Sequence, residues 1–134
     1  MSALPAQPAT TTLETAPFWE AAASGRLVLP RCDGCGEFIW YPRRFCPSCH
    51  SRSVSWSDAT GRGHVYSFTI VRRGSGRWTA AAPYVIAYVE LEEGPRVMTN
   101  IVDCEPDDVV IGLQVVVTFD DAGDGAAIPR FRPA

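Results

Sequence analysis

The chain has 134 residues, of which 46% are hydrophobic and 20% charged, a composition typical of a folded protein with one modest core and a small additional module. Its formal net charge is −3, so the chain as a whole lacks the basic excess of nucleic-acid-binding domains. No run of eighteen apolar residues could span a membrane, and no apolar segment at the start resembles a secretion signal. We therefore expect a cytoplasmic protein.

Residues 1–14 consist mostly of Ala, Pro, Thr and Gln, with almost no bulky side chain. We expect them to be a disordered tail or to be held only by a partner. From Thr15 onward the sequence predicts a short helix, because Thr15 or Ala16 can cap it, Pro17 suits its first position and Gly25 ends it.

Phe18 and Trp19 are adjacent in this helix, so they cannot both lie on one helical face. One of them should anchor the helix to its own domain. The other, which we take to be Trp19, is then free to contact a partner; the alternative is that both pack internally.

Residues 26–30 read as a strand leading into two Cys-x-x-Cys pairs separated by ten residues, formed by Cys32, Cys35, Cys46 and Cys49. Four thiolates in this pattern are typical of closed structural zinc sites, so we predict Zn2+ that holds structure and does no chemistry. Iron would fit the same four thiolates. Two disulfides would require an oxidising compartment, and a redox pair would explain only one of the two motifs.

Residues 38–41 read as the outgoing strand of this ribbon, and residues 51–58 as a link. Between residues 31 and 52 the sequence has four arginines and two acids, formally +2, while Zn2+ with four thiolates carries about −2. The basic appearance of the ribbon is therefore local neutralisation of the metal site. Four sulfurs fill the site, so we expect His50 to be solvated or to lie outside the ligand shell.

The rest of the chain reads as five strands at 64–71, 84–91, 97–102, 114–119 and 128–132, with a helical turn near residues 105–108. In the first strand, alternation places Tyr66, Phe68 and Ile70 on one face. Five short strands with a helical turn between the third and fourth favour an OB-type barrel, with a small β-sandwich as the alternative. We therefore predict a mainly β protein, with a helix and zinc ribbon at 15–58 and a barrel at 59–134.

One stretch is locally cationic. Residues 61–82 contain four arginines and no acid, whereas residues 53–134 together have seven arginines and eleven acids. The loop arginines (Arg72, Arg73 and Arg77) and Trp78 offer guanidinium groups for phosphates and an indole for an adenine ring, on a glycine-containing loop. They could bind CoA, or insert into a partner protein; the alternative is a solvated loop with Trp78 packed onto the barrel.

Nothing in the sequence indicates catalysis by the chain itself. We find no nucleophile elbow, phosphate loop or open metal site, and neither His50 nor His64 has an evident catalytic partner. Cys104 follows an apolar run, where a small buried hydrophobe is the expected role.

The order of these motifs resembles that of the acyl-CoA-associated family of zinc-ribbon plus OB-fold proteins, across residues 16–134. The matching motifs are Phe18-Trp19, Gly25-x-Leu27, Cys32-x-x-Cys35-Gly36, Pro42-Arg43, Cys46-Pro47-x-Cys49, Trp56, Gly61-Arg62-Gly63, Tyr66-x-Phe68-Thr69, Pro83-Tyr84, Gly94-Pro95-Arg96, Ile111-Gly112 and Phe131-Arg132-Pro133.

The resemblance implies an N-terminal helix, a rubredoxin-like zinc ribbon and an OB barrel. It also implies a non-catalytic subunit of a thiolase-superfamily enzyme: a thiolase, a hydroxymethylglutaryl-CoA synthase or an aldolase that cleaves steroid side-chain CoA esters. Such a subunit supports its partner and could help to contain the CoA ester. The rival hypothesis is a nucleic-acid-binding module, since ribbons and OB barrels both occur in such proteins.

Overall fold

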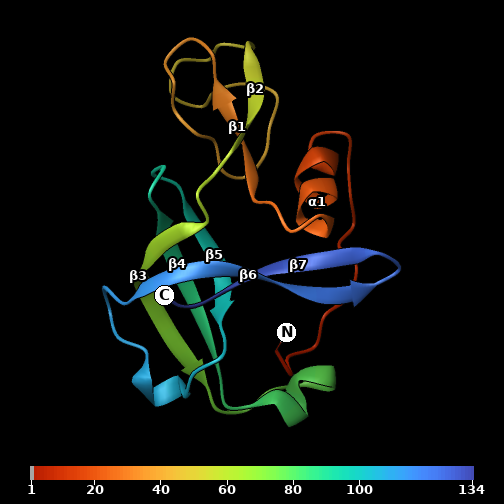
Figure 1. The fold of residues 1–134 in the computed structure, drawn as a ribbon, viewed down its shortest axis with the longest axis vertical. Helices are drawn as coiled ribbons and strands as arrows, with labels where there is room; N and C mark the ends of the chain where they lie inside the picture. The colour runs from red at the N-terminus through yellow and green to blue at the C-terminus, as the bar shows by residue number, and fades with distance from the viewer. Residues whose placement is uncertain (1) are drawn as a thin grey trace.

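The computed structural model describes residues 2–134 and consists of a zinc-ribbon-like module above a closed β-barrel, with one helix beside them (Figure 1). The elements in chain order are α1 (Ala16–Ala23), β1 (Val28–Cys32), β2 (Val54–Asp58), β3 (Arg62–Val71), the 3-10 helix η1 (Gly76–Ala81), β4 (Tyr84–Leu91), β5 (Arg96–Ile101), the 3-10 turn η2 (Pro106–Asp108), β6 (Gln114–Gly123) and β7 (Ala126–Pro133). Within residues 2–134, no helix is long and apolar enough to cross a bilayer.

Helix α1 forms as its sequence predicts. Thr15 is its N-cap residue, Pro17 lies in its first turn, and the chain leaves it through Gly25, whose φ of +74° favours glycine. Phe18 is 3% exposed and belongs to the same apolar cluster as the barrel interior. The helix is therefore anchored to the barrel through Phe18, and Trp19 is partly buried against the same cluster.

The ribbon is built differently from the prediction. Strand β1 pairs with β2 in antiparallel register from Val28↔Asp58 to Cys32↔Val54, so residues 54–58 are a strand and the predicted link is shorter. The predicted outgoing strand at 38–41 is wrong: it is reduced to one bridge, Arg31↔Phe38, and a hydrogen bond from Ile39 N–H to the Pro30 carbonyl. Residues 37–39 therefore meet β1 on the edge opposite β2, but they pair there at Arg31↔Phe38 alone and form no ladder.

The barrel confirms the OB-type prediction. Its strands close in the order β3-β4-β5-β7-β6, with antiparallel pairs throughout except between β5 and β7. Strand β4 has the predicted bounds. Strands β6 and β7 extend beyond theirs and meet at a tighter turn, with Asp124 and Gly125 at its centre.

The interior of the barrel is filled by β-branched residues and one aromatic ring: Val65, Val85, Val89, Val115 and Phe131 are at most 1% exposed. A β-bulge between Val65 and Ser67 shifts the register of β3. Because the bulge inserts one residue, Tyr66 points outward and is 45% exposed, while Phe68 and Ile70 pack against the core. The predicted common face of Tyr66 with these two residues is thus wrong.

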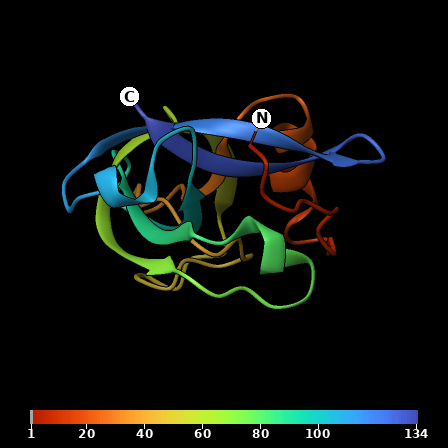
Figure 2. The ribbon, with the colours of Figure 1, turned by 90° about the horizontal axis from the view of Figure 1, so that it is seen from below.

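The connection from β3 to β4 is also more ordered than a flexible glycine loop, because residues 76–81 form η1. The N-terminal segment lies beside η1 and the β6–β7 hairpin (Figure 2). It has almost no regular secondary structure, and the barrel contacts it through Asp120 and Arg130, which bond to Ser2 and to the Leu4 and Pro5 carbonyls respectively. Its predicted disorder stays a prediction.

Candidate metal centre and binding surfaces

The four predicted metal ligands come together at the end of the ribbon. All four Sγ atoms of Cys32, Cys35, Cys46 and Cys49 lie within 4.8 Å of one another. The Cys32–Cys49 and Cys35–Cys46 sulfur pairs are 3.5 and 3.6 Å apart. Zn–S bonds of about 2.3 Å in a tetrahedron place sulfurs about 3.8 Å apart, so the cluster fits a structural zinc ion with four thiolate ligands.

Two similar backbone turns position these thiols. In the first, Gly36 N–H donates to the Cys32 carbonyl (2.9 Å), and in the second, His50 N–H donates to the Cys46 carbonyl (2.8 Å). Gly36 and His50 occupy equivalent places and both have positive φ, +77° and +64°. His50 is exposed, as expected, and contributes a turn conformation rather than a ligand.

The pKa values of the thiols differ within this site, and a bound cation would favour the ionised form of all four. The backbone N–H of Cys35 lowers the pKa of the Cys32 thiol from 9.0 to about 6. At Cys35, the backbone N–H of Glu37 lowers the pKa, but burial and the neighbouring thiols outweigh it and raise the pKa to about 12. The four thiols therefore cannot all ionise readily on their own, and a divalent cation supplies the charge that makes four thiolates compatible.

The loop arginines do not converge on one point. Arg72 pairs with Asp107 at 3.3 Å, Arg77 Nη1 donates to Gln7 Oε1 at 2.7 Å, and Arg73 is exposed without an ion pair within residues 2–134. Two of the three predicted loop arginines are thus engaged by different neighbours, and the three guanidinium groups form no cluster. Their role in binding CoA or a partner stays a prediction.

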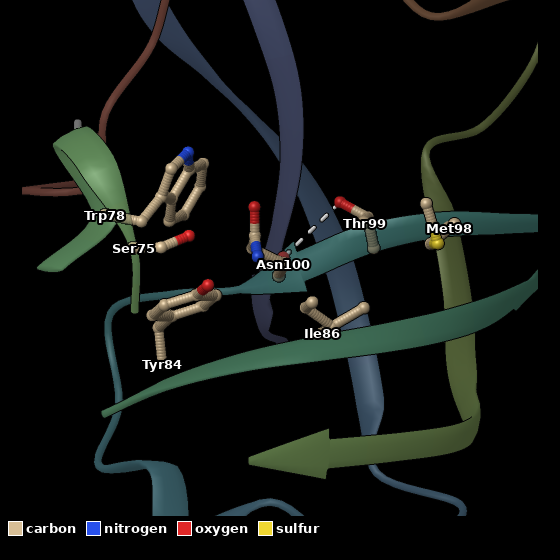
Figure 3. A pocket seen from close by; sticks show the side chains of 7 residues that line it. All are labelled: Ser75, Trp78, Tyr84, Ile86, Met98, Thr99 and Asn100. Atoms are coloured by element: carbon tan, nitrogen blue, oxygen red, sulfur yellow. Dashed lines mark hydrogen bonds between the residues drawn. The ribbon is translucent and has the colours of Figure 1, made fainter. Parts of the chain in front are cut away.

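Trp78 lines a hollow of about 290 Å³ between η1 and the outer side of β4 and β5 (Figure 3). Its ring centroid lies 4.7 Å from that of Tyr84, at an interplanar angle of 45°. Asn100 Nδ2 donates to the Val85 carbonyl, and Thr99 bonds to the Asn100 carbonyl within the hollow. The hollow thus combines two aromatic rings with polar groups, a surface able to hold a flat ring.

Trp19 lies at a different place. It lines a mainly apolar hollow of about 170 Å³ between α1, the ribbon, β5 and β7. Its ring packs edge-to-face on Phe18 at 4.8 Å between centroids, and its Nε1 is buried without an acceptor among the described residues. Trp19 and Trp78 line two different hollows, which adjoin at Met98 and Thr99 of β5.

The sequence analysis did not predict two pairs of interacting polar side chains. Arg130 and Asp120 form an ion pair in which both side chains are at most 4% exposed. His64 Nε2 lies 3.2 Å from Glu90 Oε2 on the barrel surface. Both pairs join residues on neighbouring strands, so only the strand register could have predicted them.

Two family models match the chain: "ChsH2, rubredoxin-like zinc ribbon domain" over residues 19–55 and "ChsH2, C-terminal OB-fold domain" over residues 56–120. A "DUF35 domain-containing scaffold protein" of Methanocaldococcus jannaschii is 40% identical over 115 residues, which cover 80% of this chain and 81% of that protein.

Other similar proteins are named as enzyme subunits. A probable enoyl-CoA hydratase alpha subunit of Thermomonospora curvata is 42% identical over 87% of this chain, but the match spans only 37% of that protein. The benzoylsuccinyl-CoA thiolase subunit BbsA of Geobacter metallireducens is 34% identical over 53% of this chain and 47% of its own length.

A solved structure, "Ltp2-ChsH2(DUF35) aldolase", superposes with a TM-score of 0.83 at 36% identity, covering 93% of this chain and 98% of that chain. Together with the zinc-ribbon and OB-fold matches, this likeness shows that the chain belongs to the ChsH2/DUF35 family.

Proposed function

We propose that the chain is a non-catalytic accessory subunit of a thiolase-superfamily acyl-CoA enzyme. The candidate partners are a thiolase, a hydroxymethylglutaryl-CoA synthase and a steroid side-chain retro-aldolase. The partner supplies the catalytic groups, and this chain binds and supports it.

The observation that carries the proposal is the likeness to the DUF35 chain of the aldolase structure, which extends over 98% of that chain. The relative from Methanocaldococcus jannaschii, described as a scaffold protein, matches over most of its length, and BbsA is named as a thiolase subunit. These relatives share the part of the fold that this chain has, so the shared part is what we expect to serve as the scaffold.

The chemistry of the chain supports a non-catalytic role. Four thiols close the metal centre, and a tetrahedral site of this kind leaves no position for a substrate. His64 contacts a carboxylate, and no hydrogen bond within residues 2–134 joins either histidine to a serine, threonine or cysteine side chain. The chain offers binding surfaces rather than an acid, base and nucleophile in one place.

We further propose that a CoA ester bound by the partner contacts the β3–β4 connection. Arg73 is exposed and available for a phosphate, and the hollow beside Trp78 and Tyr84 can receive a flat ring. Alanine substitutions of the loop arginines test this contact separately.

The accessory role is tested by purifying the tagged chain from its own cells and identifying co-purifying proteins by mass spectrometry. A thiolase-like enzyme in near-stoichiometric amount supports the proposal, and the acyl-CoA reaction of that enzyme is then assayed with and without this chain. Recovery of the chain alone, or with RNA that a labelled oligonucleotide displaces at low salt, contradicts it.

A further inference from the structure

The closed barrel has its shortest strand pairing between β5 and β7, and we call this place the seam. Strand β5 pairs with β4 at six positions, but with β7 at only one, Ile101↔Phe131, extended by a hydrogen bond from Val102 N–H to the Phe131 carbonyl. The Arg96–Asn100 part of β5 therefore has a strand on one side only. Unpaired strand edges are sites at which another extended chain adds by backbone hydrogen bonding.

An apolar hollow lies along this seam. It is lined by Val97, Met98 and Thr99 of β5 and by Ile128 and Pro129 of β7. Its volume of about 170 Å³ is below the roughly 300–1,000 Å³ typical of small-molecule sites. The hollow is thus the size of a side chain rather than of a complete cofactor.

Two groups at this hollow lack the partners that a folded chain usually provides. The Nε1–H of Trp19 is buried and has no acceptor among the described residues, which is costly unless an acceptor arrives. Met98 is 64% exposed at the mouth, close to Tyr41 of the ribbon, which is 42% exposed. An occupant of the hollow would have to supply a hydrogen-bond acceptor and apolar contact together.

The barrel already binds extended chain beside the seam. Arg130 donates to the Leu4 and Pro5 carbonyls of the N-terminal segment, and residues 5–7 of that segment line a hollow that also includes Ile128. Ile128 also lines the seam hollow. The hollow that holds the N-terminal segment and the seam hollow therefore adjoin at Ile128.

We propose that the β5–β7 seam is a docking site for an extended segment of the partner enzyme. The segment adds to the free edge of β5, inserts one apolar side chain between Met98 and Ile128, and offers a backbone carbonyl to Trp19 Nε1. The inference rests on the proposed function and names the part of the chain through which the two proteins associate.

The test uses the full chain in complex with the acyl-CoA enzyme that co-purifies with it. We expect backbone amides of residues 96–100 that exchange rapidly in the free chain to exchange at least about tenfold more slowly in the complex, because hydrogen-bonded strand amides are protected.

Variants at the seam provide the second readout. We expect Met98→Arg to weaken the complex at least about tenfold by placing a charge in an apolar contact, and Trp19→Phe to weaken it roughly three- to tenfold by deleting one hydrogen bond. Ile111→Arg is the matched control, since Ile111 is also 64% exposed but lies between η2 and β6. Thermal melting of each variant shows that the fold is intact.

The outcomes separate the two proposals. A complex that forms at full affinity with Met98→Arg and Trp19→Phe, without protection of residues 96–100, overturns the seam as the docking site and leaves the accessory role standing. If Ile111→Arg weakened the complex as much as Met98→Arg, that result would also contradict the seam as the docking site. Failure of any acyl-CoA enzyme to associate with the unmodified chain overturns both.

Discussion

The buried ion pair between Arg130 and Asp120 gives the sharpest stability prediction. Both side chains are at most 4% exposed, and the pair links neighbouring strands β6 and β7 to the N-terminal segment. Asp120→Asn keeps the shape but removes the charge that balances a buried guanidinium. Removing one member of such a pair costs about 3–5 kcal/mol, a large part of the roughly 5–15 kcal/mol that holds a domain together.

Thermal and urea unfolding, followed by circular dichroism, measure this effect. For a chain of this length we expect the melting temperature to fall by about 10–20 °C. Asp124→Asn is the control, because it removes the same charge from an exposed turn whose positive φ asparagine tolerates. The paired change Asp120→Leu with Arg130→Met should restore much of the loss, since apolar residues of similar size can replace a buried ion pair.

The same pair makes the stability of the fold depend on pH in the acidic range. Burial alone would raise the pKa of Asp120, but hydrogen bonds from Ser2 and Arg130 outweigh it and hold the pKa below its ordinary value of 3.8. Because the folded-state pKa is depressed, this stabilisation is complete above about pH 4 and is lost as the pH falls through the folded-state value. Asp120→Asn should lack this acid-dependent part. A variant that melts within 2 °C or so of the unmodified chain at neutral pH would refute the reasoning.

Three other changes test other parts of the molecule. Alanine at all three loop arginines should leave the melting temperature nearly unchanged but lower partner activity or CoA-ester affinity, and full activity would assign the loop to solvent. Gly63→Ala should destabilise the barrel by about 1–3 kcal/mol in urea titrations, because its Cβ would lie 2.4 Å from the Glu90 carbonyl oxygen. Cys46→Ser should abolish zinc binding, measured by elemental analysis, and disorder the ribbon while the barrel melts separately; unchanged metal content would contradict the four-thiolate site.

Features of the fold that depend on residues close together in the sequence could be predicted from it. The metal centre depends on two short turns, so the spacing of Cys32, Cys35, Cys46 and Cys49 was enough to identify it. Strand β4 alternates along its length and was predicted with its observed bounds. Both features are encoded within a few residues of one another, which is why sequence reasoning reaches them.

Features that depend on distant pairing were not predictable in this way. Strand β2 reads as a serine-rich link and becomes a strand only because β1 lies beside it. The bulge after Val65 turns Tyr66 outward, and no glycine or other turn residue at this position indicates it. The N-terminal segment is bound through its backbone and through the Ser2 hydroxyl by Asp120 and Arg130, more than a hundred residues away. These contacts join residues that are remote in the sequence, so no local pattern of the segment could indicate them.

The metal centre and the seam are physically connected, although they lie at different places in the fold. The ribbon has a small apolar cluster of Cys32, Ile39 and Cys46, and two of these three residues are the predicted metal ligands. The next residue, Trp40, packs on Phe18 of α1 at 5.3 Å between ring centroids and lines the seam hollow together with Trp19. Without the metal, Cys32 and Cys46 are no longer held together beneath Ile39, and the wall that Trp40 gives to the hollow loses this support. A closed zinc site with no chemistry of its own thus still matters for binding, because it shapes one side of the surface that we propose the partner occupies.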